Sequence, residues 1–183
     1  MGKRDRIETF VLYGVFVCYI ILLIKALLLS RVSLLDLFSG QNMDYRSVNI
    51  IPFRSIMEVF TASSGTVKTF SFGNVIGNIL IFIPLGLYLP LLKREKRVAV
   101  SLLIVLIVSL TVEVVQGIFG IGTADIDDVI LNSLGGWIGI LGYRLLLFLF
   151  RDEKKVRTVI TILAAVVGLP IVFYLLFMVR MRF

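Results

Sequence analysis

The sequence contains no histidine, a single cysteine and few charges. Of its 183 residues, only 17% are charged. Without histidine the chain has no catalytic imidazole, no histidine proton relay and no His-ligated zinc or iron. Cys18 stands alone in an apolar run, which excludes an internal disulfide framework and a thiolate metal cluster. Any chemistry therefore has to come from carboxylates, amides, hydroxyls or basic groups.

Hydrophobic residues are what the sequence has in excess. They make up 58% of the chain, and the mean hydropathy of +1.01 lies far above that of soluble domains. The net charge is +7, but the basic residues lie between apolar runs and form no stripe with interleaved aromatics. These features predict a membrane protein whose partner is the lipid bilayer, and they argue against nucleic acid.

Five apolar stretches are long enough to cross a bilayer, which takes about 20 residues in a helix. Because a chain in lipid must satisfy its own backbone hydrogen bonds, each stretch is expected to be helical. The fold class predicted is an all-α polytopic membrane protein: one membrane domain, 1–183, with a bundle of about five transmembrane helices. The predicted spans are 7–29, 74–92, 98–118, 129–150 and 156–179.

The distribution of Lys and Arg predicts the orientation of the bundle. Eleven of the 19 basic residues lie in the amino terminus and in segments 93–97 and 151–157, whereas the opposite side has six. Since cytoplasmic loops carry the excess of basic residues, the N-terminus is predicted to be cytoplasmic. The long loop 30–73 is then external, with enough apolar residues to lie on the bilayer or to pack between helices. We expect a multi-pass protein of a cell membrane.

Polar side chains converge on the external ends of three predicted helices. In each helix one pair of them is spaced three or four residues apart and so shares a face. The helical rise of about 1.5 Å per residue places the deeper ones roughly 6–8 Å below the outer helix ends. The set comprises Asn74 and Asn78 in the second span, Glu113 and Gln116 in the third, and Asp125, Asp127, Asp128 and Asn132 around the start of the fourth.

Two interpretations of this acidic and amide cluster stay open. Glu113 alone is compatible with an interfacial acid or an interhelical hydrogen bond, and aspartates at a helix start suit the helix dipole and its free N–H groups. Three acids within four positions repel one another, which favours a functional site. Such oxygens are suited to Mg²⁺ or Ca²⁺, to a cationic group on an amphipathic ligand, or to general acid catalysis. The sequence assigns no metal and no cofactor.

Glycines in two predicted helices indicate close helix packing. Gly135 and Gly139 form a small-xxx-small pair in the fourth span, and Gly77 and Gly86 are interpreted in the same way in the second. Pro84 removes one backbone hydrogen bond and is expected to kink the second helix.

Four motifs in this order resemble those of VanZ-like membrane proteins, and the resemblance covers a core of residues 49–143. It implies a small multi-helix bacterial membrane protein, found largely in Gram-positive bacteria, whose family namesake confers low-level resistance to teicoplanin, a lipid-tailed glycopeptide. Many members have an arginine shortly before the acidic run, where this chain has Gly122, Thr123 and Ala124. Arg54 is a candidate to supply that cation. The motifs are Asn49-Ile-Ile-Pro52-Phe53, the segment from Gly77-Asn78 through Pro84-Leu-Gly86, Glu113-x-x-Gln116, and Asp125-Ile-Asp127-Asp128 through Asn132 to Gly135-Gly136.

The leading functional hypothesis is antibiotic resistance through an external site that binds a lipoglycopeptide or a lipid-linked cell-wall precursor. A membrane enzyme that acts on a lipid-linked substrate with a carboxylate-bound divalent cation is the alternative, so the sequence leaves open whether the protein is an enzyme. A structural partner of a larger assembly is a third possibility, and five helices without an inverted repeat argue against a transporter. The candidate ligand-binding residues are Asn49, Arg54, Asn78, Glu113, Gln116, Asp125, Asp127, Asp128 and Asn132.

Overall fold

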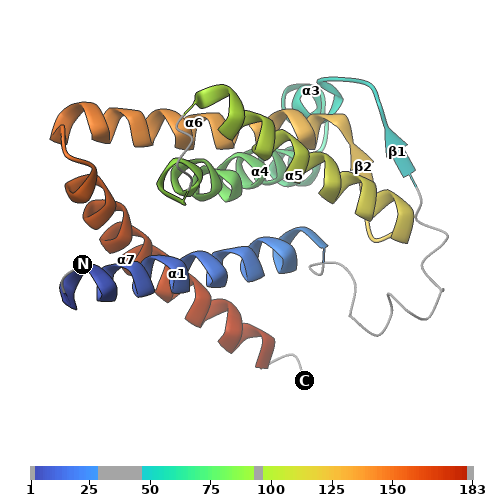
Figure 1. Cartoon of the computed structure of the whole chain (residues 1–183). Helices are drawn as coiled ribbons and strands as arrows, with labels where there is room; N and C mark the ends of the chain where they lie inside the picture. Colours follow the sequence, from blue (N-terminus) through green and yellow to red (C-terminus); the bar gives the residue numbers. More distant parts are fainter. Residues whose placement is uncertain (1–2, 29–46, 93–96, 181–183) are drawn as a thin grey trace. The chain divides into compact units, whose positions relative to one another are not determined.

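The computed structural model describes residues 3–28, 47–92 and 97–180 of the chain. Long helices form almost all of this part, and two three-residue strands pair with each other (Figure 1). The prediction of an all-α polytopic membrane fold is confirmed. The elements are α1 (Lys3–Leu28), β1 (Ser47–Asn49), α3 (Arg54–Thr61), α4 (Gly65–Leu92), α5 (Val98–Phe119), β2 (Thr123–Asp125), α6 (Ile126–Phe150) and α7 (Glu153–Arg180).

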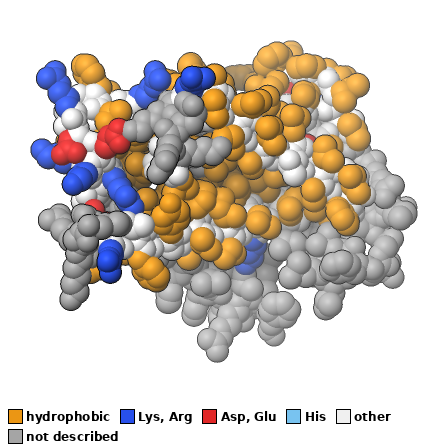
Figure 2. All heavy atoms as spheres, viewed as in Figure 1, with side chains coloured by type: hydrophobic (Ala, Val, Ile, Leu, Met, Phe, Trp, Pro, Cys, Tyr) orange, Lys and Arg blue, Asp and Glu red, His pale blue; other side chains and the backbone are white. Residues whose placement is uncertain are grey.

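Within the described residues, four helices are long and apolar enough to cross a membrane. They are Arg6–Leu28 of α1 and the whole of α4, α5 and α6. Hydrophobic side chains cover much of the molecular face seen in Figure 2, as expected of a surface that meets lipid. The fifth predicted span, 156–179, lies in α7, but the side chains of 171–180 are outside the described residues. Whether α7 spans the membrane therefore stays a prediction.

The predicted loop 30–73 is wrong at its carboxyl end, because α4 begins at Gly65, nine residues before the predicted start of the span. The Thr69 hydroxyl donates to the carbonyl of Gly65 at 3.0 Å within this added segment, and Lys68 N–H donates to the carbonyl of Ser64 at 3.1 Å. Polar residues in 65–73 lower the local hydropathy without breaking the helix, so a hydropathy window misses them. The loop also contains β1 and α3, while its residues 30–46 lie outside the described residues, as does most of the basic segment 93–97.

Glycines bring α4 and α6 into backbone contact. A methyl group at Gly135 would overlap the backbone carbonyl of Ile79, and one at Gly139 would overlap that of Ile83. Gly86 is equally close to the backbone of α6. The packing predicted for these three glycines is therefore confirmed. It is wrong for Gly77, where an added methyl group would meet no atom within 4 Å.

The chain divides into two compact units. One, Ala26–Gly142, contains both strands, α3, α4, α5 and the first part of α6, with Phe82 and Val105 fully buried. The other combines Met1–Lys25 with Tyr143–Phe183. In this second unit Arg157 donates from Nη2 to the Thr9 hydroxyl at 2.7 Å, which joins α7 to α1. The candidate site belongs to the first unit.

Candidate functional site

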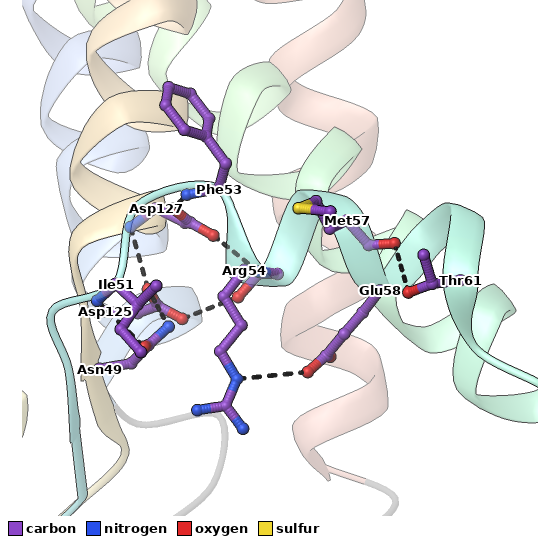
Figure 3. A network of polar contacts seen from close by, with 10 residues as sticks. Asn49, Ile51, Phe53, Arg54, Met57, Glu58, Thr61, Asp125 and Asp127 are labelled. Atoms are coloured by element: carbon purple, nitrogen blue, oxygen red, sulfur yellow. Dashed lines mark hydrogen bonds and ion pairs between the residues drawn. The ribbon is translucent and has the colours of Figure 1, made fainter.

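A short parallel ribbon brings two distant segments of the chain together. β1 pairs with β2 so that Val48 lies opposite Ala124 and Asn49 lies opposite Asp125. The Asn49 amide donates from Nδ2 to Asp125 Oδ1 at 3.0 Å, and its Oδ1 accepts the N–H of Ile51 at 3.3 Å. The side chain of Asn49 therefore fixes both the register of the ribbon and the turn that follows it (Figure 3).

Asp125 joins three segments through its carboxylate. Besides Asn49, its Oδ1 accepts the N–H of Asp127 at 2.9 Å, which is the bond of an N-cap residue at the start of α6. Its Oδ2 accepts the hydroxyl of Ser55 at 2.8 Å. Its own N–H donates to Glu113 Oε2 at 2.8 Å. Asp125 thus acts as a helix cap and as a connection between β2, α3 and α5.

Asp127 is fully buried and holds the start of α3. Its two carboxylate oxygens accept backbone N–H groups, Oδ1 from Phe53 and Oδ2 from Ser55 at 2.7 Å. Phe53 has a φ of 67°, in the left-handed region that non-glycine residues rarely adopt, and the bond to Asp127 holds it there. We call the contacts of Asn49, Phe53 and Ser55 with Asp125 and Asp127 the carboxylate clamp (Figure 3).

A second group of contacts joins α4 to α6 through Asp128. Asn74 and Asn78 both donate from Nδ2 to Asp128 Oδ1, at 3.2 and 2.5 Å. The two amides thus share a face and point at the acidic run, as their spacing predicts. One turn further along α6, Asn132 donates from Nδ2 to the hydroxyl of Ser109 at 2.9 Å, and both side chains are buried. No hydrogen-bond partner for Asn132 Oδ1 is present in the described part of the chain.

Two predicted site residues lie apart from this network. Gln116 donates from Nε2 to the carbonyl of Leu27 at the end of α1, 2.8 Å away, and so does not join Glu113 at the acidic run. Arg54 lies beside the clamp, but its guanidinium pairs with Glu58 one turn later, at 3.7 Å, and both side chains are largely exposed (Figure 3). The structure therefore places Arg54 at the surface of α3 rather than against the aspartates.

An open groove of about 510 Å³ lies next to the clamp. Its volume is within the range of small-molecule sites. The walls are mainly apolar, and the buried Glu113 contributes the one carboxylate among the lining residues. These residues are Val48, Glu113, Val114, Gly117, Ile118 and Ala124.

The carboxylates of the acidic run face donors of the chain itself. Asp125 and Asp127 accept hydrogen bonds on both oxygens, and Asp128 accepts two amides on one. Among the described residues, no group of three or more acidic or cysteine side chains has a geometry that would hold a metal ion. In the described part of the chain, these hydrogen bonds give the aspartates a structural role.

Three participants in the site were not foreseen from the sequence. Ser55 contributes both its N–H and its hydroxyl to the clamp, Phe53 contributes its N–H, and Ser109 accepts from Asn132. Ser55 lies two residues after the first motif, so its position was a usable signal. Phe53 takes part through its backbone N–H, which every residue except proline has, so its side chain did not indicate this role.

Comparison with known proteins agrees with the motifs. The family model described as VanZ/LLP1 matches residues 16–150. The chain is similar to Protein VanZ of Enterococcus faecium, with 34% identity over 148 residues, which covers 80% of this chain and 82% of the relative. No solved structure matches the chain. On the extent of both matches, the chain belongs to the VanZ/LLP1 family.

Proposed function

We propose that this membrane protein protects bacteria against lipid-tailed glycopeptide antibiotics such as teicoplanin, through a site on the external side that binds an amphipathic ligand. Membership of the VanZ/LLP1 family and similarity to Protein VanZ support a role in resistance. The ligand is the lipoglycopeptide itself or a lipid-linked cell-wall precursor. Both molecules join a hydrocarbon chain to a polar head that carries hydrogen-bond donors.

The groove beside the clamp is the observation that carries this proposal. Val114 and Ile118 of α5 and Val48 of β1 offer an apolar wall to a hydrocarbon chain, while Glu113 offers a carboxylate to a polar head. A carboxylate has about four acceptor positions, and one of those of Glu113 accepts the N–H of Asp125. An apolar wall next to a charged acceptor is suited to an amphipathic molecule.

The other predicted site residues take a positioning role in this proposal. Asn49, Asp125 and Asp127 hold β1 and the start of α3, and so fix the wall to which Val48 belongs. Asp128 and Asn78 fix the start of α6 against α4. Gln116 and Arg54 contact neither group of hydrogen bonds, and we expect their substitution to affect resistance less.

Growth inhibition tests the proposal. A susceptible Gram-positive host is compared with and without the protein, against a glycopeptide with an acyl tail and one without. We expect the protein to raise the inhibitory concentration of the lipidated compound several-fold and that of the other compound little. Equal protection against both compounds, or none, would contradict the proposal.

Matched variants then test the groove. Val114→Phe fills the groove, whereas Leu110→Phe introduces the same side chain one turn earlier on α5, at an exposed position outside the groove lining. Glu113→Gln removes the charge but keeps an oxygen that can accept the N–H of Asp125. We expect Val114→Phe and Glu113→Gln to reduce protection and Leu110→Phe to retain it, at equal amounts of inserted protein. Binding of each candidate ligand to the purified protein in nanodiscs distinguishes the antibiotic from the wall precursor.

A further inference from the structure

The helix α3 and the turn before it expose an unusual amount of apolar surface for a rigidly held segment. No residue of α3 is buried. We call five exposed apolar side chains the α3 rim, and their exposed fractions run from 54% to 77%. They are Ile50, Ile51, Phe53, Met57 and Phe60.

The α3 rim is not a loosely attached loop. Asp127 binds the backbone of Phe53 and Ser55, and α3 packs alongside α4. Within the helix, Met57 N–H donates to the carbonyl of Phe53 at 2.9 Å, and the Thr61 hydroxyl donates to the carbonyl of Met57 at 2.9 Å. The buried carboxylate of Asp127 therefore holds in place a segment whose apolar side chains point outward. In water that arrangement would be unfavourable, since exposed apolar area costs free energy in proportion to its size.

The side chains of α3 are sorted onto two faces. Phe53, Met57 and Phe60 follow one another at intervals of four and three residues, which puts them on one stripe of a helix. Arg54 and Glu58 have the same spacing one residue later and form an ion pair at 3.7 Å. In Figure 3 the ring of Phe53 points away from the side chains of Arg54 and Glu58. A short helix with this pattern is suited to the boundary between lipid and water.

The surroundings of α3 indicate which partner covers the rim. The span α4 begins at Gly65, four residues after α3 ends, and its first turns expose Val67 and Phe70. The rim is thus continuous along the chain with a surface that faces lipid. Lys68 and Arg54 are exposed beside it, and their cationic groups complement the phosphates of phospholipid head groups.

We infer that the α3 rim is embedded in the membrane, with Phe53, Met57 and Phe60 among the upper acyl chains and Arg54 and Glu58 at the head groups. The carboxylate clamp then has a mechanical consequence. Because Asp127 ties α3 to the start of α6, contact of the rim with lipid fixes the depth of that helix start relative to the bilayer surface. This inference concerns the lipid contact alone and does not depend on which ligand the groove binds.

Tryptophan fluorescence in vesicles tests the inference. Trp137, the one tryptophan of the sequence, is first replaced by phenylalanine so that each variant carries a single tryptophan probe. The full chain is then reconstituted into vesicles of phosphatidylcholine and phosphatidylglycerol. Met57→Trp and Phe60→Trp place the probe on the apolar stripe, and Glu58→Trp is the matched control on the polar stripe of the same helix. Each protein is measured with phosphatidylcholine brominated on its acyl chains and, separately, with iodide in the buffer.

We expect brominated lipid to quench the probes at Met57 and Phe60 at least twofold more strongly than the probe at Glu58. Iodide should give the opposite order. Two results would overturn the inference. If iodide quenches the Phe60→Trp probe as strongly as it quenches the Glu58→Trp probe, the rim lies in water. Protection of both rim probes from both quenchers would place the rim against protein, for example a second copy of the chain.

Discussion

Ser55 donates its backbone N–H to Oδ2 of Asp127 at 2.7 Å, although the two residues are 72 positions apart in the sequence. Asp127 is fully buried, and its other oxygen accepts the N–H of Phe53. A buried carboxylate is unfavourable unless its lone pairs are used, and here backbone donors use them. The acidic run thus holds the first VanZ-like motif to the start of α6.

Replacement of Asp127 by Asn should destabilise the protein. The amide keeps one acceptor oxygen but directs an NH₂ group at a backbone N–H, so one part-buried backbone donor loses its partner. Such a loss costs about 1–3 kcal/mol. For a chain of this size that corresponds to a lower melting temperature by roughly 2–4 °C per kcal/mol. Thermal unfolding of the purified protein in detergent measures the change.

Glu58→Gln is the matched control for Asp127→Asn. It makes the same change of a carboxylate to an amide, but on an exposed side chain whose ion pair spans 3.7 Å. Exposed pairs contribute about 0–1 kcal/mol, so its melting temperature should stay close to that of the original protein. Equal stability of both variants would show that the clamp contributes nothing to folding.

Two glycines of the membrane helices should respond oppositely to an added methyl group. Gly139→Ala would press its Cβ against the backbone carbonyl of Ile83, and overpacking of this kind costs about 1–3 kcal/mol. Gly77→Ala meets open space and gains about 1 kcal/mol of helix propensity. Melting temperatures in detergent should therefore fall for Gly139→Ala and stay level or rise for Gly77→Ala. The reverse order would contradict the packing of α4 on α6.

The parts of the fold that were predictable from the sequence are those set by hydropathy and by spacing along one helix. Apolar runs located the helices, and the four-residue interval placed Asn74 and Asn78 on the face that meets Asp128. The closeness of Gly135 and Gly139 to α4 followed from their size. Each of these predictions used only the spacing and hydropathy of residues that are near one another in the chain.

The parts that were not predictable depend on pairs far apart in the sequence. Nothing in the spacing of Asn49 indicates that it pairs with Asp125, 76 residues away, across a parallel ribbon. The interval between Glu113 and Gln116 suggested a common direction, yet Gln116 reaches the end of α1 while Glu113 binds the N–H of Asp125. A three-residue step turns a side chain by about 60° on a helix, which is enough for two different neighbours.

The buried bond between Asn132 and Ser109 should couple α6 to α5. Asn132→Ala and Ser109→Ala each remove one partner, and the double variant removes both. Coupling energies of buried polar pairs in membrane helices average about 0.6 kcal/mol and reach about 1.7. Thermal or denaturant unfolding of the four proteins in a double-mutant cycle gives the coupling. Additive effects of the two substitutions would mean that this hydrogen bond contributes no net stability.

Labelling with a membrane-impermeant maleimide should establish which side of the membrane carries the clamp. In a Cys18→Ser background, Ser64→Cys introduces a thiol at an exposed position between α3 and α4, and Lys154→Cys introduces one at the exposed start of α7. Since basic residues favour the cytoplasm, we expect intact cells to label the first variant and not the second. Permeabilised cells should label both, which shows that each thiol reacts.

Labelling of Lys154→Cys alone in intact cells would show that the groove and the clamp face the cytoplasm. A glycopeptide antibiotic acts outside the cell, so the site and its ligand would then lie on opposite sides of the membrane. That result would contradict both the proposed function and the predicted orientation.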